Sequence, residues 1–187
     1  MAHEIVVVRH GATEWSESGR HTSSTDLALT DAGRLEAERL REPLQAFDLA
    51  LVLTSPMRRA RETADICGVG ARAEVDDRLR EWDYGAYEGV TTPEVRETVP
   101  GWTVWTGPCP DGETAAHVGA RADAVLARLE PVEGAVAVFS HGHFLRVLTA
   151  RWLGLPPTDG RLFALHTGTL SVLGYEREQS VLQRLNG

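Results

Sequence analysis

The sequence predicts an α/β fold, a three-layer sandwich in which a mostly parallel central sheet carries helices on both faces. Apolar runs of strand length alternate with amphipathic helical segments along the chain, as they do in layered α/β proteins. The run 5–8 contains four β-branched residues in succession, which is typical of a strand buried on both faces. The chain has 187 residues without repeats or linkers, so we expect a single domain over residues 1–187.

The bulk composition is that of an ordinary globular protein and excludes several kinds of partner. Hydrophobic residues make up 42% and charged residues 25% of the sequence, which is typical of a soluble domain. The net charge of −8 predicts no nucleic-acid partner, because such a binding face is usually basic. All 19 basic residues are Arg, which excludes a Walker A loop and a Schiff-base lysine, since both need Lys. An anion site must therefore be a local pocket of positive charge.

The cysteines and the amino terminus bear on where the chain works. Cys67 and Cys109 have no metal-ligand or redox spacing, so we expect free thiols in a reducing compartment. The amino terminus leads straight into an apolar strand without a signal peptide, and no apolar run is long enough to span a membrane. The expected location is the cytoplasm, with no membrane partner.

The first third of the chain predicts two strand-helix units. Residues 14–26 are rich in Ser, Thr and Gly and are predicted to form a loop. Apolar residues recur at helical spacing over 31–46, which predicts an amphipathic helix. The apolar run 49–53 has strand length. Pro56 suits the first position of the helix that follows over about 57–67.

The middle of the chain is less regular. A weak strand is predicted at 71–75, followed by a loop over 78–89 that is dense in charged and aromatic residues. A short helix is predicted over 92–99, because Pro100 and Gly101 end the pattern.

The last third continues the alternation. Apolar spacing predicts a helix over 113–129, a buried strand over 135–139 and a helix that ends at Gly154. Further strands are predicted at 162–165 and 170–175, with a last strand or a tail at 181–185.

Arginine and histidine side chains follow three of the predicted strands. The first strand ends in Arg9-His10-Gly11, the second leads into Arg58 and Arg59, and a later one ends in Ser140-His141-Gly142. The carboxyl ends of parallel strands meet at one edge of a sheet, so these groups are expected to share one pocket. Guanidinium groups match phosphate oxygens in a bidentate manner. The pattern therefore predicts a phosphate-binding pocket.

These residues resemble the histidine phosphatase superfamily, which includes the cofactor-dependent phosphoglycerate mutases. Arg9-His10-Gly11 is similar to the family signature, and Ser55-Pro56-Met57-Arg58-Arg59-Ala60-Arg61-Glu62-Thr63-Ala64 is similar to its second block. Arg80-Glu81-Trp82-Asp83-Tyr84-Gly85-Ala86-Tyr87-Glu88-Gly89 resembles the block that bears the acid, and Ser140-His141-Gly142 resembles the block of the second histidine. Four blocks in the right order make the resemblance specific, and it covers most of the chain. It implies a phosphoglycerate mutase-like fold.

The resemblance implies a reaction that passes through a phosphohistidine. His10 would attack phosphorus, and it must be neutral and donate its other ring N–H, as to a backbone carbonyl. Arg9, Arg59 and His141 would stabilise charge on the phosphoryl oxygens. Glu81 would protonate the leaving oxygen and then deprotonate water. This scheme requires no metal and no cofactor.

Several assignments compete with alternatives. Asp83 and Glu88 lie close enough in sequence to compete with Glu81 for the acid role, and the resemblance favours Glu81. Tyr84 either donates to phosphate or packs in the core. His143 forms a His-Gly-His spacing with His141, but no third metal ligand is evident, so it is either accidental or a substrate contact.

The remaining binding candidates lie in polar loops and at the second histidine block. Ser16, Thr22 and Ser23 lie in the loop where the family contacts substrate, and Gly142 follows the second histidine. These loops are often merely polar, so a structural role is the alternative.

The resemblance favours a phosphatase over a mutase. The segment 89–111 is short and little chain follows Tyr175, which predicts an open site that water can enter. The acid block is similar to a branch with broad-specificity acid phosphatases and a sedoheptulose-bisphosphate phosphatase. We expect a metal-independent phosphomonoesterase for small phosphorylated metabolites such as sugar phosphates. The alternatives are a 2,3-bisphosphoglycerate-dependent phosphoglycerate mutase and a non-catalytic phosphate-binding module. The expected partner is a small phosphate ester, with a homodimer as an option.

Overall fold

A six-stranded sheet forms the centre of the structure, a computed structural model that describes residues 2–187. Its strands lie in the order β3-β2-β4-β1-β5-β6, and their bounds are β1 Ala2–Arg9, β2 Leu49–Thr54, β3 Glu74–Val75, β4 Gly134–Ser140, β5 Leu170–Glu176 and β6 Gln179–Arg184. Strands β1 to β4 pair in parallel, whereas β5 is antiparallel to both of its neighbours. The predicted mostly parallel sheet is confirmed.

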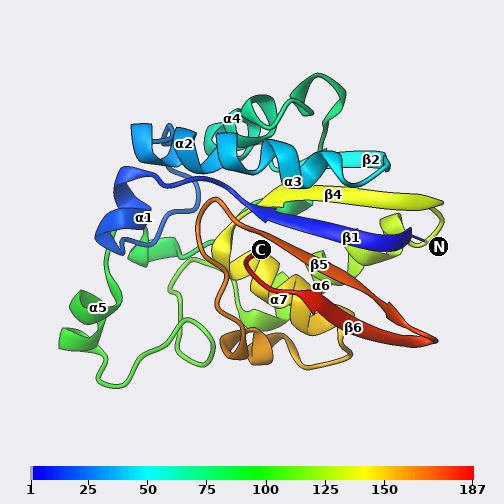
Figure 1. Cartoon of the computed structure of the whole chain (residues 1–187). Coiled ribbons are helices and arrows are strands. Elements are labelled where there is room, and N and C mark those ends of the chain that lie inside the picture. Colours follow the sequence, from blue (N-terminus) through cyan, green and yellow to red (C-terminus); the bar gives the residue numbers. More distant parts are fainter. Residues whose placement is uncertain (1) are drawn as a thin grey trace.

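Helices cover both faces of the sheet (Figure 1). One face carries α2, α3 and α4, and the other carries α6 and α7, with bounds α2 Asp31–Arg39, α3 Arg41–Gln45, α4 Arg58–Ile66, α6 Ala115–Leu129 and α7 Gly142–Trp152. Two short helices, α1 Glu14–Ser18 and α5 Thr92–Thr98, lie beyond the carboxyl ends of the parallel strands (Figure 1). Four short 3₁₀ turns complete the connections, at η1 Gly70–Arg72, η2 Asp77–Leu79, η3 Gly85–Tyr87 and η4 Pro157–Leu162.

Strand β1 forms the middle of two hydrophobic cores. Ile5 and Val7 pack with the α6–α7 layer, whereas Val6 and Val8 pack with the α2–α4 layer. All four side chains are at most 1% exposed, because successive side chains of a strand point to opposite faces. Burial of each such side chain contributes roughly 1.5–3 kcal/mol. The run predicted to be buried on both faces therefore anchors the residue that follows it, His10.

The two helices around β2 differ from their predicted bounds. The predicted helix 31–46 is broken at Leu40 into α2 and α3. Pro43 causes the break, because it lacks the N–H that would bond the Arg39 carbonyl, and its ring crowds that carbonyl. The next helix begins at Arg58 after an extended N-cap at Met57, so Pro56 precedes the cap and does not occupy the first helical position.

One of the irregular segments was predicted wrongly, and two were predicted correctly only in part. Residues 162–165 are not a strand. The chain after η4 is irregular and packs Leu165 into the core. Only Glu74 and Val75 of the predicted strand 71–75 join the sheet. The predicted loop 14–26 begins with a helical turn, α1, because Thr13 and Ser16 form a capping box.

Within residues 2–187, no helix combines the length and the apolar character that crossing a bilayer requires.

Candidate active site

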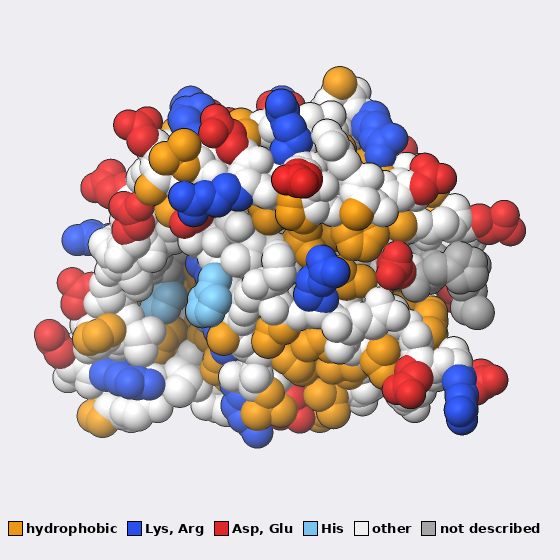
Figure 2. All heavy atoms as spheres, viewed as in Figure 1, with side chains coloured by type: hydrophobic (Ala, Val, Ile, Leu, Met, Phe, Trp, Pro, Cys, Tyr) orange, Lys and Arg blue, Asp and Glu red, His pale blue; other side chains and the backbone are white. Residues whose placement is uncertain are grey.

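A cavity of about 220 Å³ opens at the carboxyl ends of the parallel strands. Strands β1 and β4 are neighbours in register, with Arg9 opposite Ser140, so the two motifs at their ends lie side by side. Figure 2 shows imidazole groups at this end of the molecule, with acidic side chains spread around its periphery. The cavity is lined by Arg9, His10, Thr13, Ser16, Gly19, Arg20, His21, Thr22, Glu81, Tyr84, Thr92, Gly142, His143 and Arg146.

His10 is held in one tautomer with one ring nitrogen free. Its Nδ1 lies 2.7 Å from the Gly11 carbonyl oxygen, which accepts only, so Nδ1 carries the hydrogen and Nε2 carries the lone pair. Burial, together with the Arg59 and Arg9 charges, holds the pKa of His10 well below its usual value. The ring is therefore neutral at physiological pH, as a nucleophilic imidazole must be.

Arg9 presents an unsatisfied donor at the same place. One of its terminal nitrogens donates to the Leu165 carbonyl, whereas the buried Nε has no partner among the described residues. Gly142 packs against the guanidinium, and a Cβ at this position would lie 3.2 Å from Arg9 Cζ. The glycine therefore lets a cation approach the first turn of α7, and a buried N–H without a partner suits an anionic ligand.

Arg59 and His141 lie behind the cavity, where both are completely buried. Arg59 Nε donates to His141 Nδ1 at 3.1 Å, so the other ring nitrogen, Nε2, carries hydrogen and donates to Ser55 Oγ at 2.8 Å. Burial and the Arg59 charge hold the pKa of His141 well below its usual value. His141 is therefore neutral, and its ring lies 5.2 Å from the His10 ring, centroid to centroid.

The remaining donors of Arg59 organise the loop before α2. Its terminal nitrogens donate to the carbonyls of Thr22, Ser23 and Thr25. Arg59 thus fixes this loop, one side of the cavity mouth, as well as the second histidine. In this structure it does not line the cavity, so its charge acts on the site from behind.

The Glu81 carboxylate faces the cavity at the amino end of α7. It accepts hydrogen bonds from the backbone N–H groups of Trp82, His143 and Phe144 at 2.8–3.0 Å. No side chain of the N-cap residue caps this helix, so Glu81 supplies the cap and complements the helix dipole. Glu81 is 6% exposed. The acid group is therefore held rigidly in the wall of the cavity that Arg9 also lines.

The two competing carboxylates are used elsewhere. Asp83 accepts from the backbone N–H of Gly85, and Glu88 accepts from those of Ser23 and Thr25. Neither lines the cavity. Of the three acids considered from the sequence, the structure brings only Glu81 to the site.

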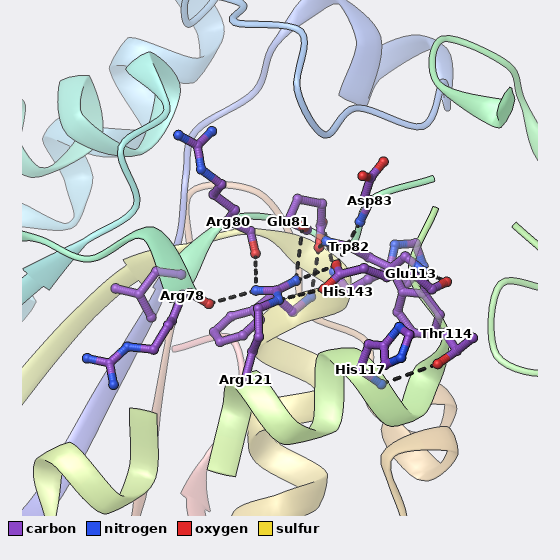
Figure 3. Close-up of polar contacts among 12 residues, drawn as sticks. Arg78, Arg80, Glu81, Trp82, Asp83, Glu113, Thr114, His117, Arg121 and His143 are labelled. Atoms are coloured by element: carbon purple, nitrogen blue, oxygen red, sulfur yellow. Dashed lines mark hydrogen bonds and ion pairs between the residues drawn. The ribbon is translucent and has the colours of Figure 1, made fainter. Parts of the chain in front are cut away.

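Arg121 of α6 clamps the loop that carries Glu81 (Figure 3). It donates to the backbone carbonyls of Arg78, Arg80 and Glu81. Its guanidinium also lies 5.0 Å above the centre of the Phe144 ring. Carbonyls that would otherwise lack partners are thus satisfied by one planar cation.

Glu113 completes this clamp from the other side. It pairs with Arg121 at 2.7 Å, and its carboxylate accepts from the Asp83 N–H. The Glu113 carbonyl accepts from the Trp82 indole N–H (Figure 3). The acid loop is therefore bonded on both sides of Glu81, which fixes the direction of the carboxylate.

Tyr84 and His143 form a second oriented pair. The Tyr84 hydroxyl lies 2.7 Å from His143 Nδ1. Burial raises the pKa of Tyr84 well above its usual value, and burial lowers that of His143 well below its own. Both groups are therefore neutral, and the hydroxyl and Nδ1 share one hydrogen bond in which either can be the donor. Tyr84, for which both phosphate contact and core packing were considered, is buried yet lines the cavity.

The loop candidates for substrate binding lie in different places. Ser16 and Thr22 line the cavity, although Ser16 Oγ also caps α1 and Thr22 Oγ1 donates to the Arg20 carbonyl. Ser23 is buried and lines a separate cavity on the other side of the acid loop. The structure therefore brings Ser16, Thr22 and Gly142 to the site and does not bring Ser23.

Sequence reasoning missed several residues that line the cavity. They are Thr13, Gly19, Arg20, His21, Thr92 and Arg146. Only Arg146 had a usable signal, because it follows His143 by three positions and so shares its face of α7. Arg20 and Thr92 meet through contacts between distant loops, such as the bridge between Arg20 and Thr91.

Two other features of the described residues bear on the site. No three His, Cys, Asp or Glu side chains within residues 2–187 gather as a metal site would require. A larger groove of about 310 Å³ lies at the opposite end of the sheet, and its lining is mostly apolar. It contains none of the candidate catalytic side chains.

Comparison with known proteins agrees with this geometry. The sequence model of the histidine phosphatase superfamily (branch 1) matches residues 5–187. The chain is 44% identical over 178 residues to an acid phosphatase of Mycobacterium tuberculosis, which covers 93% of this chain and 87% of that protein. It is 37% identical over 184 residues to sedoheptulose 1,7-bisphosphatase of Saccharomyces cerevisiae, which covers 80% of this chain and 67% of that protein.

Solved structures show the same fold. The product of an open reading frame of Mycobacterium tuberculosis superposes with a TM-score of 0.94 at 42% identity, covering 100% of this chain and 98% of that one. The family match, the relatives and the histidine-arginine cavity all point the same way. The chain therefore belongs to the histidine phosphatase superfamily, in its branch 1.

Proposed function

We propose that this chain is a metal-independent phosphomonoesterase that hydrolyses small phosphorylated metabolites, sugar phosphates among them, through a phosphohistidine. The observation that carries the proposal is the pairing of two groups in one cavity. His10 is neutral with Nε2 free, and the Glu81 carboxylate faces the same space. A phosphate-binding module needs cations alone, whereas hydrolysis needs a nucleophile and an acid.

The first step transfers the phosphoryl group to His10. A phosphate ester binds with its phosphoryl oxygens against Arg9, whose buried Nε lacks a partner. His10 Nε2 attacks phosphorus and forms the N–P bond as the bond to the leaving oxygen breaks. Protonated Glu81 gives its proton to that oxygen, so the product leaves as an alcohol.

The second step returns His10 to its starting state. Glu81, now a carboxylate, takes a proton from a water molecule that attacks phosphorus. The N–P bond breaks, inorganic phosphate leaves, and Glu81 is protonated again. The Gly11 carbonyl holds the Nδ1 hydrogen of His10 throughout, which stabilises the phosphorylated ring.

Arg59 and His141 act by position and charge. Because both side chains are completely buried, their mutual hydrogen bond sets the environment of the His10 ring. The guanidinium charge close to the phosphoryl group stabilises the additional negative charge of the transition state in a site with little water.

The relatives support phosphatase chemistry. The two named above are an acid phosphatase and a bisphosphatase of a sugar. The chain is also proposed to work as one catalytic domain, because β1 near one terminus and β6 near the other belong to the same sheet. The free thiols of Cys67 and Cys109 support the proposed cytoplasmic location, where thiols stay reduced.

A panel assay in EDTA tests the proposal. Phosphate release is followed from an aryl phosphate, a hexose monophosphate and a hexose bisphosphate, with isomerisation of 3-phosphoglycerate measured in parallel. We expect release without isomerisation, and loss of release in His10→Ala. Isomerisation with little release would show a mutase, and undiminished release by folded His10→Ala would contradict the nucleophile assignment.

A further inference from the structure

The peptide group between Gly11 and Ala12 is hydrogen-bonded on both of its sides. Its carbonyl oxygen accepts the Nδ1 hydrogen of His10 at 2.7 Å. Its N–H, which belongs to Ala12, donates to Oε2 of Glu36 at 2.8 Å. A trans peptide points its carbonyl and its N–H in opposite directions, so the peptide stands between the imidazole and the carboxylate. The three groups form one chain of hydrogen bonds, which we call the Glu36 relay.

Two glycines let helix α2 come close enough for Glu36 to reach this peptide. A Cβ at Gly33 would overlap the backbone of Ala12, and a Cβ at Gly11 would overlap the backbone of Gly33. Only residues without a side chain allow the helix and the loop to approach in this way. Residues three apart on a helix share a face, so Glu36 follows Gly33 on the face of α2 that meets the loop.

The Glu36 carboxylate is also held by the segment that leads into β5. Thr167 Oγ1 donates to Glu36 Oε1 at 3.4 Å. Gly168 packs against the Glu36 side chain, and its N–H donates to the His10 carbonyl at 3.1 Å. Glu36 is half-buried and does not line the cavity. Any effect that it has on the reaction must therefore pass through the groups that it holds.

The His10 ring gains positive charge when it reacts. It begins neutral with its hydrogen on Nδ1, and it keeps that hydrogen when Nε2 forms the N–P bond, so the phosphorylated ring is cationic. Burial and the Arg59 and Arg9 charges, which lower the pKa of His10, oppose positive charge on this ring. Hydrogen bonds in a chain polarise one another. A carboxylate at the far end therefore makes the Gly11 carbonyl a stronger acceptor for the charged ring.

We propose that Glu36 is a positioning residue for the nucleophile, which acts through the Gly11–Ala12 peptide to hold the Nδ1 hydrogen of His10 and to stabilise the phosphorylated ring. No proton moves along the relay, since Nδ1 keeps its hydrogen and Glu36 stays a carboxylate through both steps. In Ser-His-Asp enzymes the carboxylate bonds to the histidine directly, whereas here a peptide group lies between them. This inference rests on the proposed phosphohistidine mechanism and adds one residue to it.

Glu36→Gln removes the charge and keeps the shape of the side chain. The amide oxygen can still accept from the Ala12 N–H, so the loop should keep its structure. Charge-assisted hydrogen bonds are roughly twice as strong as neutral ones, so we expect kcat/KM for an aryl phosphate to fall about fivefold. Glu38→Gln is the matched control, because Glu38 is an exposed residue of the same helix. It should leave kcat/KM unchanged.

The proton NMR signal of the His10 Nδ1 hydrogen reports on the relay without turnover. It is assigned as the ring N–H signal that is missing from His10→Gln. We expect it to move upfield in Glu36→Gln, because the Gly11 carbonyl is then less polarised, and to stay in place in Glu38→Gln. Inorganic phosphate should inhibit Glu36→Gln as strongly as the wild type, since Arg9 still faces the cavity.

The outcomes separate the relay from the function on which it rests. An unchanged Nδ1 signal or an unchanged kcat/KM in folded Glu36→Gln would overturn the relay and leave the phosphatase intact. Weaker inhibition by phosphate with an unchanged Nδ1 signal would also overturn it and would place the effect at Arg9, whose charge interacts with that of Glu36. If the wild type releases phosphate from no ester, the proposed function itself fails.

Discussion

Arg59 Nε donates a hydrogen bond to Nδ1 of His141 at 3.1 Å, and neither side chain is exposed. The bond joins α4 to the start of α7 beneath the cavity. It fixes the His141 tautomer, because guanidinium only donates. The same cation holds three carbonyls of the loop 22–25, so one residue determines two walls of the site.

Arg59→Lys is expected to lower kcat/KM for any phosphate ester by about a hundredfold, because removal of an organised donor has an effect of this size. Lysine cannot donate in the fixed fork that reaches His141 and the loop carbonyls together. Hydrogen exchange over residues 22–25 should rise in the same variant. Arg58→Lys is the control, since Arg58 is exposed and pairs with Glu62, and an equal loss there would contradict the role of Arg59.

Glu81→Gln is expected to reduce hydrolysis of a sugar phosphate much more than that of an activated aryl phosphate. An aryl leaving group departs without a proton, whereas an alkoxide needs one. Steady-state kcat on the two substrates gives the ratio. Asp83→Asn, two residues further along and outside the cavity, should not change that ratio. Equal losses on both substrates in Glu81→Gln would remove Glu81 from the acid role.

Arg121→Ala is expected to reduce hydrolysis of a sugar phosphate more than that of an aryl phosphate, but by a smaller ratio than Glu81→Gln does. Arg121 touches no part of the cavity lining except the acid loop, whose carbonyls it holds. Loss of the clamp lets the carboxylate turn away from the leaving oxygen, so the sugar phosphate should suffer most. Arg121→Lys should restore part of the ratio. A uniform loss on both substrates would indicate a general effect on folding.

The acid side of the pH profile should lie below pH 6.5. Burial and the neighbouring guanidinium groups lower the pKa of His10 and His141 well below 6.5, so the nucleophile stays neutral in mildly acidic solution. The kcat/KM profile for an aryl phosphate measures this, because it reports groups of the free enzyme. An acid limb at or above pH 6.5 that disappears when His141 is replaced would contradict the prediction.

The same shifts predict how stability depends on pH. Burial lowers the pKa of His143 as it does those of His10 and His141. The unfolded chain binds protons to these three histidines below about pH 6.5, whereas the folded chain does not. Their contribution is therefore complete above pH 6.5 and is lost as the pH falls toward the lower folded pKa values. Urea unfolding at pH 7.5 and pH 5 should show a smaller free energy of unfolding at pH 5, and His143→Phe should reduce the difference.

Asp76 should contribute to stability over a different range of pH. Hydrogen bonds from Arg78 and then Arg128 lower the pKa of Asp76 from 3.8 to about 2. The stabilisation is present above pH 3.8 and is lost as the pH falls toward 2. Asp76→Asn should lower the free energy of unfolding at pH 7 by about 1–2 kcal/mol, with little effect at pH 2. An equal effect at both values would assign the loss to packing.

The sequence predicted the elements whose patterns are strong. The apolar runs of β1, β4 and β5 and the helices α6 and α7 fall close to their expected positions. The predicted helix 31–46 is broken for a local reason, and the predicted strand 162–165 is absent for a tertiary one. Pro43 breaks the first, and the second is held by core packing at Leu165 without any partner strand.

The sequence by itself determined the chemistry at the ends of the strands. Arg9, His10 and His141 follow apolar runs, and a parallel sheet must bring such ends to one edge. The register of β1 with β4 then sets Arg9 opposite Ser140. The meeting of these strand ends at one edge can therefore be predicted from the sequence, whereas the register is a property of the folded sheet.

Only the tertiary structure decided which polar groups face the cavity and which are used internally. The Ser23 backbone N–H donates to the Glu88 carboxylate, so these two residues are bonded to each other outside the cavity. Arg20 reaches the cavity from the loop after α1, whereas His143 and Arg146 reach it from α7, far away in the sequence. Side chains of one type differ in their roles because each role depends on the partners that folding supplies. No spacing along the chain encodes those partners, since they are chosen by packing between distant elements.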